Sequence, residues 1–230
     1  METPPSEKPS LDLTPLLDIF IAPARAFVRI GKKPQWGQAY ALVVILNVVA
    51  FVLIWPAIAH IIAVNPALQD KSAKGIAEAQ REAREGQIFF TVFLPYIQWG
   101  LCAAFLTLFS RASQAPIRAF NVFFALAAYT SLPSAVGTVL QGIIIAVHGP
   151  SAYHSFAELN LALPDSLALL HPNGQARELA FLGYWDVFDV WSLSLLGLGF
   201  ATLNKLDPAA GLRIAYSLGL VYALLGALLT

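Results

Sequence analysis

The sequence predicts an all-α membrane protein with five transmembrane helices. Of the 230 residues, 57% are hydrophobic and only 12% are charged, about half the charged fraction of an ordinary soluble domain. A soluble chain of this length still needs a polar surface, and a bilayer removes that need. Five stretches also reach the roughly 20 predominantly apolar residues that a spanning helix requires. These stretches are residues 36–64, 88–109, 119–147, 183–204 and 210–229.

The segment before the first span predicts two short amphipathic helices. Residues 1–11 contain three prolines and little apolar surface, so we expect disorder there and a single membrane domain over 12–230. From Leu13 onward, apolar residues recur three and four positions apart. Pro23 separates two helices, which we expect to lie flat in the membrane interface. A helix pair docked on the protein itself is the alternative. The predicted contacts to lipid headgroups are Arg25, Arg29, Lys32 and Lys33.

Each of the first three spans contains an internal proline. Pro56, Pro95 and Pro133 lie in the first, second and third spans, and proline frees a backbone carbonyl and bends a helix. The first and third spans are longer than a bilayer needs, which predicts tilting, kinking or protrusion. Trp36 and Tyr40 open the first span as expected interfacial anchors. The sequence therefore predicts a bundle of bent helices.

The two long connections differ in composition. Residues 65–87 are alanine-rich with charges of both signs, which is typical of a solvated helix. Residues 149–182 contain a half-apolar stretch that is too short to span, so we expect it to fold back onto the bundle. With the N-terminus in the cytoplasm, nine lysines and arginines lie inside and five outside. The positive-inside rule therefore predicts a multi-pass membrane protein with a cytoplasmic N-terminus and an outer C-terminus.

The fourth span carries two acids, Asp186 and Asp189, near its start. An ionisable group costs roughly 3 kcal/mol or more at the membrane centre, so it marks a candidate functional site. The two residues are three apart and share one helix face. They can form a proton or cation site, cap the helix N-terminus close to water, or pair with a basic group of a neighbouring element. The residues alone leave these three alternatives open.

Small residues follow the acids. Gly197 and Ala201 have the four-residue spacing of close helix contacts, and Gly199 adds to this surface. We expect this surface to pack against another span, with homodimerisation as the alternative.

No catalytic, cofactor or metal motif is present. The chain has no GxSxG, HExxH, phosphate-loop or GxGxxG pattern, so we expect neither an enzyme nor a cofactor. The four histidines are scattered over the outer side, and we predict no metal site. The formal net charge is zero, which argues against nucleic acid as a partner.

Three stretches together resemble a known family. They are IAPARAFVRI at 21–30, FFALAAYTSLPSAVGTVL at 123–140 and WDVFDVWSLSLLGLGF at 185–200. In this order they are similar to the Yip family of small polytopic membrane proteins, whose eukaryotic members interact with Ypt/Rab GTPases. The residues that carry the resemblance are Pro23, Phe27, Tyr129, Pro133, Asp189, Trp191, Leu195 and Gly199.

The resemblance implies a five-span bundle with a cytoplasmic N-terminus and a role in membrane organisation or trafficking. The N-terminal region is shorter than the tail of eukaryotic members and looks prokaryotic, which argues against a Rab-type GTPase as partner. We therefore expect a non-enzymatic scaffold or organiser that contacts other membrane proteins or a second copy of itself. The rival expectation is a component of an ion, proton or small-solute transporter or channel that uses Asp186 and Asp189.

Overall fold

The computed structural model confirms the predicted all-α membrane architecture. It describes residues 13–68, 72–112, 119–171 and 173–229, so the predicted disorder at 1–11 lies outside the described residues. Five helical segments are long and apolar enough to cross a membrane. The helices are α1 (Thr14–Ile21), α2 (Pro23–Lys32), α3 (Gly37–Val64), α4 (Ala73–Ala112), α5 (Phe120–Thr130), α6 (Leu132–His148), α7 (Phe156–Asn160), α8 (Ala176–Gly183), α9 (Val187–Asn204) and α10 (Pro208–Leu229), with short 3-10 turns η1 (Pro66–Leu68), η2 (Pro150–Ala152) and η3 (Leu167–Leu170).

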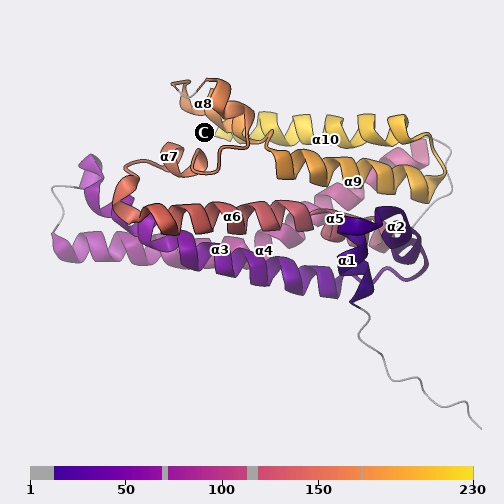
Figure 1. Ribbon diagram of the computed structural model, residues 1–230, viewed down its shortest axis with the longest axis horizontal. Coiled ribbons are helices and arrows are strands. Elements are labelled where there is room, and N and C mark those ends of the chain that lie inside the picture. The colour runs from indigo at the N-terminus through magenta and orange to yellow at the C-terminus, as the bar shows by residue number, and fades with distance from the viewer. Residues whose placement is uncertain (1–12, 69–71, 113–118, 172, 230) are drawn as a thin grey trace, which may run out of the picture.

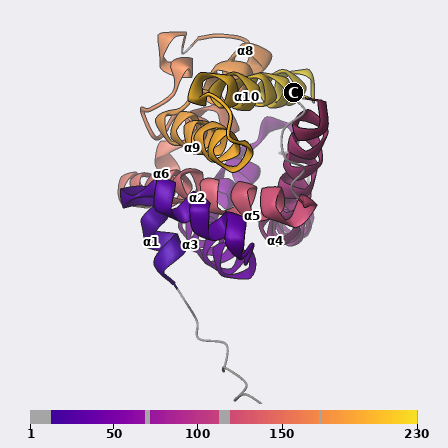
Figure 2. The same cartoon turned by 90° about the vertical axis from the view of Figure 1, so that its right-hand side faces the viewer.

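The long helices run side by side along one direction (Figure 1). The main pairings are α3 along α6, α9 along α10, and α4 against α3 and α5. The third span consists of α5 and α6, which are separate helices. The short helices α1 and α2 lie at one end of the bundle, where α9 ends, and the end-on view places them beside α3 and α5 (Figure 2). The connection with α7 and α8 lies towards the opposite end.

The second span is part of a much longer helix than predicted. We expected a separate solvated helix within 65–87 and a span from residue 88, but α4 runs unbroken over 40 residues. At 1.5 Å per residue it is about 60 Å long, twice the hydrocarbon thickness. Its first turns carry an Arg81–Glu85 ion pair of 2.8 Å, and the Gln80 side chain donates to the carbonyl of Ala59 in α3 at 2.8 Å. These contacts hold the projecting part as helix.

The fourth span begins later than predicted. Helix α8 ends at Gly183, and α9 starts at Val187. Between them the chain is extended, because it pairs with the preceding loop: Val187 N–H donates to the Asp165 carbonyl and Leu167 N–H to the Trp185 carbonyl, each at 3.2 Å. The 149–182 connection thus folds back onto the bundle, and it determines where α9 begins.

The helix pair α1–α2 is docked on the protein through one face. Ala26, Phe27 and Ile30 of α2 are buried, and α2 packs mainly on α9 and α5. The opposite face of α1 stays exposed, with Leu17 and Ile21 among its open side chains. Docking on the protein, the alternative in our sequence analysis, therefore accounts for only one face of the pair.

Candidate functional site

The third span is broken near its middle, at Pro133. Proline lacks the N–H that would continue the helix and clashes with the preceding turn, so α5 ends at Thr130 and α6 starts two residues later. In a bilayer, freed backbone groups need partners. The Thr130 hydroxyl donates to the Leu126 carbonyl and the Ser131 hydroxyl to the Ala128 carbonyl, both at 2.9 Å. Side chains next to the break therefore bond back to the last turns of α5.

The amide side of the break is satisfied by α9. Ser134 N–H donates to the Ser192 hydroxyl at 3.2 Å, and the Ser134 hydroxyl donates to the Asp189 carboxylate at 2.5 Å. The two serine hydroxyls lie 2.7 Å apart. The positive end of the α6 dipole also favours a carboxylate at this position. Asp189 and Ser192 thus sit at the N-terminus of a half-helix that starts inside the bundle.

The two acids of the fourth span have different roles. Asp186 is the N-cap of α9, and its carboxylate accepts the backbone N–H of Asp189 at 2.7 Å. Asp189 reaches across to Ser134 instead. Among the described basic side chains, none forms an ion pair with either acid. Of the three alternatives, capping therefore describes Asp186, and Asp189 belongs to a hydrogen-bond network between helices.

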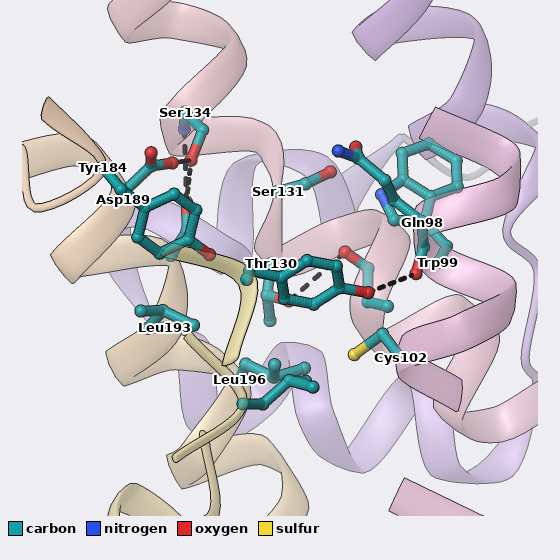
Figure 3. A pocket seen from close by; sticks show the side chains of 14 residues that line it. Gln98, Trp99, Cys102, Thr130, Ser131, Ser134, Tyr184, Asp189, Leu193 and Leu196 are labelled. Carbon is teal, nitrogen blue, oxygen red and sulfur yellow. Dashed lines mark hydrogen bonds between the residues drawn. The ribbon is translucent and has the colours of Figure 1, made fainter. Parts of the chain in front are cut away.

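Asp189 lies deeper in the bundle than its place near the start of α9 suggests. It lines a cavity of about 260 Å³ together with Gln98 and Cys102 of α4 and Tyr222 of α10 (Figure 3). Gln98 is midway along the apolar stretch 88–109 of its helix. The acid therefore lines the same cavity as a residue from the middle of the second span.

A second cavity, of about 100 Å³, shares this pair with the first. Asp189 and Ser134 line both cavities. The Asp189–Ser134 hydrogen bond therefore joins two residues that border both spaces. The other polar residues that line the second cavity are Thr138, Gln141, Asn160, Asp165, Ser166 and Asp186.

The second cavity is lined by acids, and one buried hydroxyl group in its lining lacks a hydrogen-bond partner. Burial, together with the charge of Asp186, raises the pKa of Asp165 to about 6, and burial also raises the pKa of Asp186. The hydroxyl oxygen of Ser166 is buried without a hydrogen-bond partner. Because a carboxyl group with a pKa of about 6 exchanges its proton close to neutral pH, Asp165 makes this cavity chemically suited to holding a proton.

The histidines do not build a metal site. Within the described residues, no three histidine, cysteine or acidic side chains are placed to hold a metal ion. The rings of His60 and His154 lie 6.2 Å apart. His148 bonds to the carbonyl of its own helix, and His171 lies 3.5 Å from Glu178.

The other residues singled out in the sequence form the packing frame around the cavities. The Phe27 ring of α2 lies against Gly199 of α9, and Trp191 meets Phe20 edge-on at 5.6 Å between ring centroids. The Tyr129 hydroxyl donates to the Gln35 carbonyl at 3.0 Å, tying α5 to the chain before α3. Gly197 also contacts the backbone of Gly211, and Pro23 opens α2. The remaining residues are exposed and are not part of this packing: Arg25, Arg29, Lys32 and Lys33.

Sequence reasoning missed two residues of the site, Ser134 and Asp165. Ser134 had a usable signal, because a polar residue directly after a mid-span proline is well placed to meet the freed backbone. Asp165 had none, because its loop reaches the bundle only through long-range pairing with the start of α9.

Comparison with known proteins identifies the family. A sequence model described as the Yip1 domain matches residues 17–230, which is nearly the whole chain. No curated protein and no solved structure matches it. The family match includes both halves of the broken span, the two acids and the docked α2. The chain therefore belongs to the Yip1-domain family, and it is an integral membrane protein of the Yip type.

Proposed function

We propose that the protein is a non-enzymatic organiser of a bacterial inner membrane that acts through contacts with other membrane proteins. One observation carries this proposal: the residues that resemble the family, such as Phe27, Tyr129 and Gly199, are used to hold helices together. A frame of this kind fixes an outer surface for partners. Membership of the family supports membrane organisation or trafficking as the proposed role.

The outer side of α4 is the contact surface that we favour for a partner helix. Phe93, Ile97 and Leu101 recur every four residues on it and are each more than half exposed. Residues at this spacing form one stripe along a helix. Aromatic and aliphatic side chains on such a stripe pack against either lipid or another transmembrane helix. The partner is either another membrane protein or a second copy of this chain.

Charge supports the proposed orientation, with the N-terminus in the cytoplasm. The exposed charges at the α1–α2 end are mostly basic, whereas the opposite end carries most of the acids. Such an asymmetry favours the basic end inside. The described basic residues at that end are Arg25, Arg29, Lys32, Lys33, Arg111, Lys205 and Arg213.

Photo-crosslinking in native membranes tests the organiser proposal. A crosslinking amino acid at Phe93 is expected to capture a discrete partner or a second copy. The same group at Leu106, which is fully buried on α4, is the matched control and is expected to capture none. Purification of a lone monomer in several mild detergents, with no adduct at Phe93, would contradict the proposal.

A second candidate function is a component of a proton, ion or small-solute pathway. The specific observation is that the Asp189–Ser134 hydrogen bond joins two residues that line both cavities at a broken helix. Transporters place ion and substrate sites at interrupted helices near the bilayer midplane. A carboxylate bonded to a hydroxyl chain can also relay a proton, because each hydroxyl both donates and accepts.

Flux measurements in proteoliposomes test this second function. Asp189→Asn removes the titrating group but keeps an acceptor for Ser134, and Asp186→Asn keeps an effective N-cap. Both variants are therefore expected to fold and to lose proton or cation flux. Asp207→Asn, an exposed acid between α9 and α10, is the control and should leave flux unchanged. Absence of flux in the unaltered protein, or flux indifferent to both substitutions, would sink this function.

A further inference from the structure

Helix α1 has two apolar faces, and only one of them is covered. Ile19 is fully buried against the bundle. On the other side Leu13, Leu17 and Ile21 are 50%, 67% and 76% exposed. These three residues are four positions apart and form one stripe along the helix. An eight-residue helix that leaves such a stripe open needs an apolar environment outside the protein.

The position of α1 places this stripe at the level of the bilayer. Phe20 meets Trp191 of α9, and Trp191 precedes the end of α9 by about 20 Å of helix at 1.5 Å per residue. Helix α2 then follows the last turns of α9, because Phe27 lies at Gly199 and a side chain at Gly31 would touch Leu203. Both views show α1 and α2 at the side of the bundle, near the end of α9 (Figures 1 and 2). The stripe therefore faces the region that lipid occupies.

Basic side chains border the same element. The carboxylate of Asp18 is only 5% exposed and lies 3.3 Å from Arg29 and 3.8 Å from Arg25. The side chains of Arg29 and Arg25 remain 43% and 68% exposed, so each keeps N–H groups for another acceptor. Lys32 and Lys33 follow and are exposed. Four cations against one buried acid leave an excess of positive charge, and Asp18 fixes the two arginines beside α1.

We propose that α1 and α2 form a docking surface for anionic phospholipids of the adjacent leaflet. The stripe of Leu13, Leu17 and Ile21 contacts the acyl chains, and the basic residues bind the headgroup phosphates. Guanidinium groups suit this role because they donate to phosphate in a bidentate manner. An acidic soluble protein fits less well, because the apolar stripe lies at bilayer depth. This surface functions independently of the organiser and pathway proposals.

Depth-dependent quenching tests the acyl contact in the full chain. A bimane label at Leu17→Cys, in a Cys102→Ala background, is expected to be quenched strongly by doxyl-labelled phospholipid in proteoliposomes. The same label at Glu82→Cys, on the exposed projecting part of α4, is the control and should be quenched weakly. Equal, weak quenching at both positions would overturn the acyl contact.

Headgroup selectivity tests the phosphate contact with the same label. Quenching by doxyl-phosphatidylglycerol is expected to exceed that by doxyl-phosphatidylcholine, because each juxtamembrane cation attracts anionic lipid by about 1 kcal/mol, roughly fivefold. Lys32→Gln with Lys33→Gln should reduce the preference several-fold without touching Asp18. Lys74→Gln with Arg84→Gln, at the opposite end, should not change it. Equal quenching by the two lipids in the unaltered protein would overturn the proposal.

A test of the two arginines requires a variant that still folds. Arg25→Gln with Arg29→Gln strands the Asp18 charge in a buried position, which is costly. We therefore add Asp18→Asn to this pair, and the triple variant is expected to fold and to lose most of the remaining preference for phosphatidylglycerol. A folded triple variant with full preference would show that the arginines do not bind the headgroups.

Discussion

The two halves of α9 pack in opposite ways. The first half, from Asp186 to Ser192, faces hydroxyls, carboxylates and two cavities. The second half contains the close-packed contacts: Gly197 contacts the α10 backbone, Gly199 receives the Phe27 ring, and Phe200 is fully buried. One helix therefore carries both a candidate site and the contact that holds its neighbours. Substitutions in the second half should change stability, and substitutions in the first half should change function.

The largest effect is expected at Gly197→Ala. An added Cβ would lie 2.8 Å from the Leu212 Cα and 2.9 Å from the Gly211 carbonyl oxygen. Both are backbone atoms, so the two helices must separate. Overpacking of this kind costs typically 1–3 kcal/mol, and we expect about 3 kcal/mol here. Thermal unfolding in detergent measures the loss.

Gly100→Ala is the matched control for this prediction. A Cβ at Gly100 of α4 meets nothing within 4 Å, so its melting temperature should stay equal or rise slightly, because alanine favours helix over glycine. Equal melting temperatures for the two variants would mean that α9 and α10 are not in close contact.

A smaller loss is expected at Gly199→Ala, in the same half. A Cβ there would meet the end of the Leu126 side chain of α5 first and would lie 3.0 Å from the Phe27 ring. Both neighbours are side chains and can shift. We expect a loss of about 1–2 kcal/mol, with α2 loosened from α9. Protease accessibility at Arg25 and Arg29, compared with that of Gly100→Ala, reports the loosening. Unchanged proteolysis would show that Phe27 does not depend on this glycine.

In the first half, Ser134→Ala should cost about 1 kcal/mol. It removes hydroxyl bonds to Asp189 and Ser192, and bonds between membrane helices contribute about this amount. Asp189→Asn keeps an acceptor for Ser134 and should cost less. Thermal unfolding of both variants in detergent decides the order. If Asp189→Asn destabilised the protein as much as Gly197→Ala, the division between the halves of α9 would fail.

The smallest effect is a pH dependence at Asp165, in the loop that covers the first half. Its pKa is raised to about 6 by burial, so the folded state binds its proton more tightly than the unfolded chain does. Lowering the pH from 7 to 5 should therefore stabilise the pairing of this loop with the start of α9. The protection of the Val187 amide from hydrogen exchange, corrected for the intrinsic rate, measures it.

Asp165→Asn should flatten this pH profile, whereas Glu158→Gln in the same connection should leave it unchanged. A profile that is equally steep in Asp165→Asn would assign the titration to another group.

The sequence predicted the parts of the fold that local chemistry decides. Hydropathy identified five spans. The prolines of the first three spans could not be told apart in the sequence, and only Pro133 lies at an interruption, whereas Pro56 and Pro95 lie inside continuous helices. The start of the fourth span was not predictable, because α9 begins where Val187 pairs with the distant Asp165. We expected Trp36 and Tyr40 to be interfacial anchors, and for the same reason the sequence did not predict their ring contacts with Tyr96. The ring centroids lie 5.7 Å and 6.2 Å from that of Tyr96. Each of these contacts joins residues far apart in the chain, and no local pattern records them.

The length of α4 has a mechanical consequence. About 60 Å of unbroken helix crosses a bilayer of about 30 Å, so roughly half of it lies outside the hydrocarbon. The projecting part is bonded to α3 through Gln80, and the same helix carries Gln98, which lines the first cavity. A partner that binds the projecting part is therefore connected to the wall of that cavity by one continuous helix.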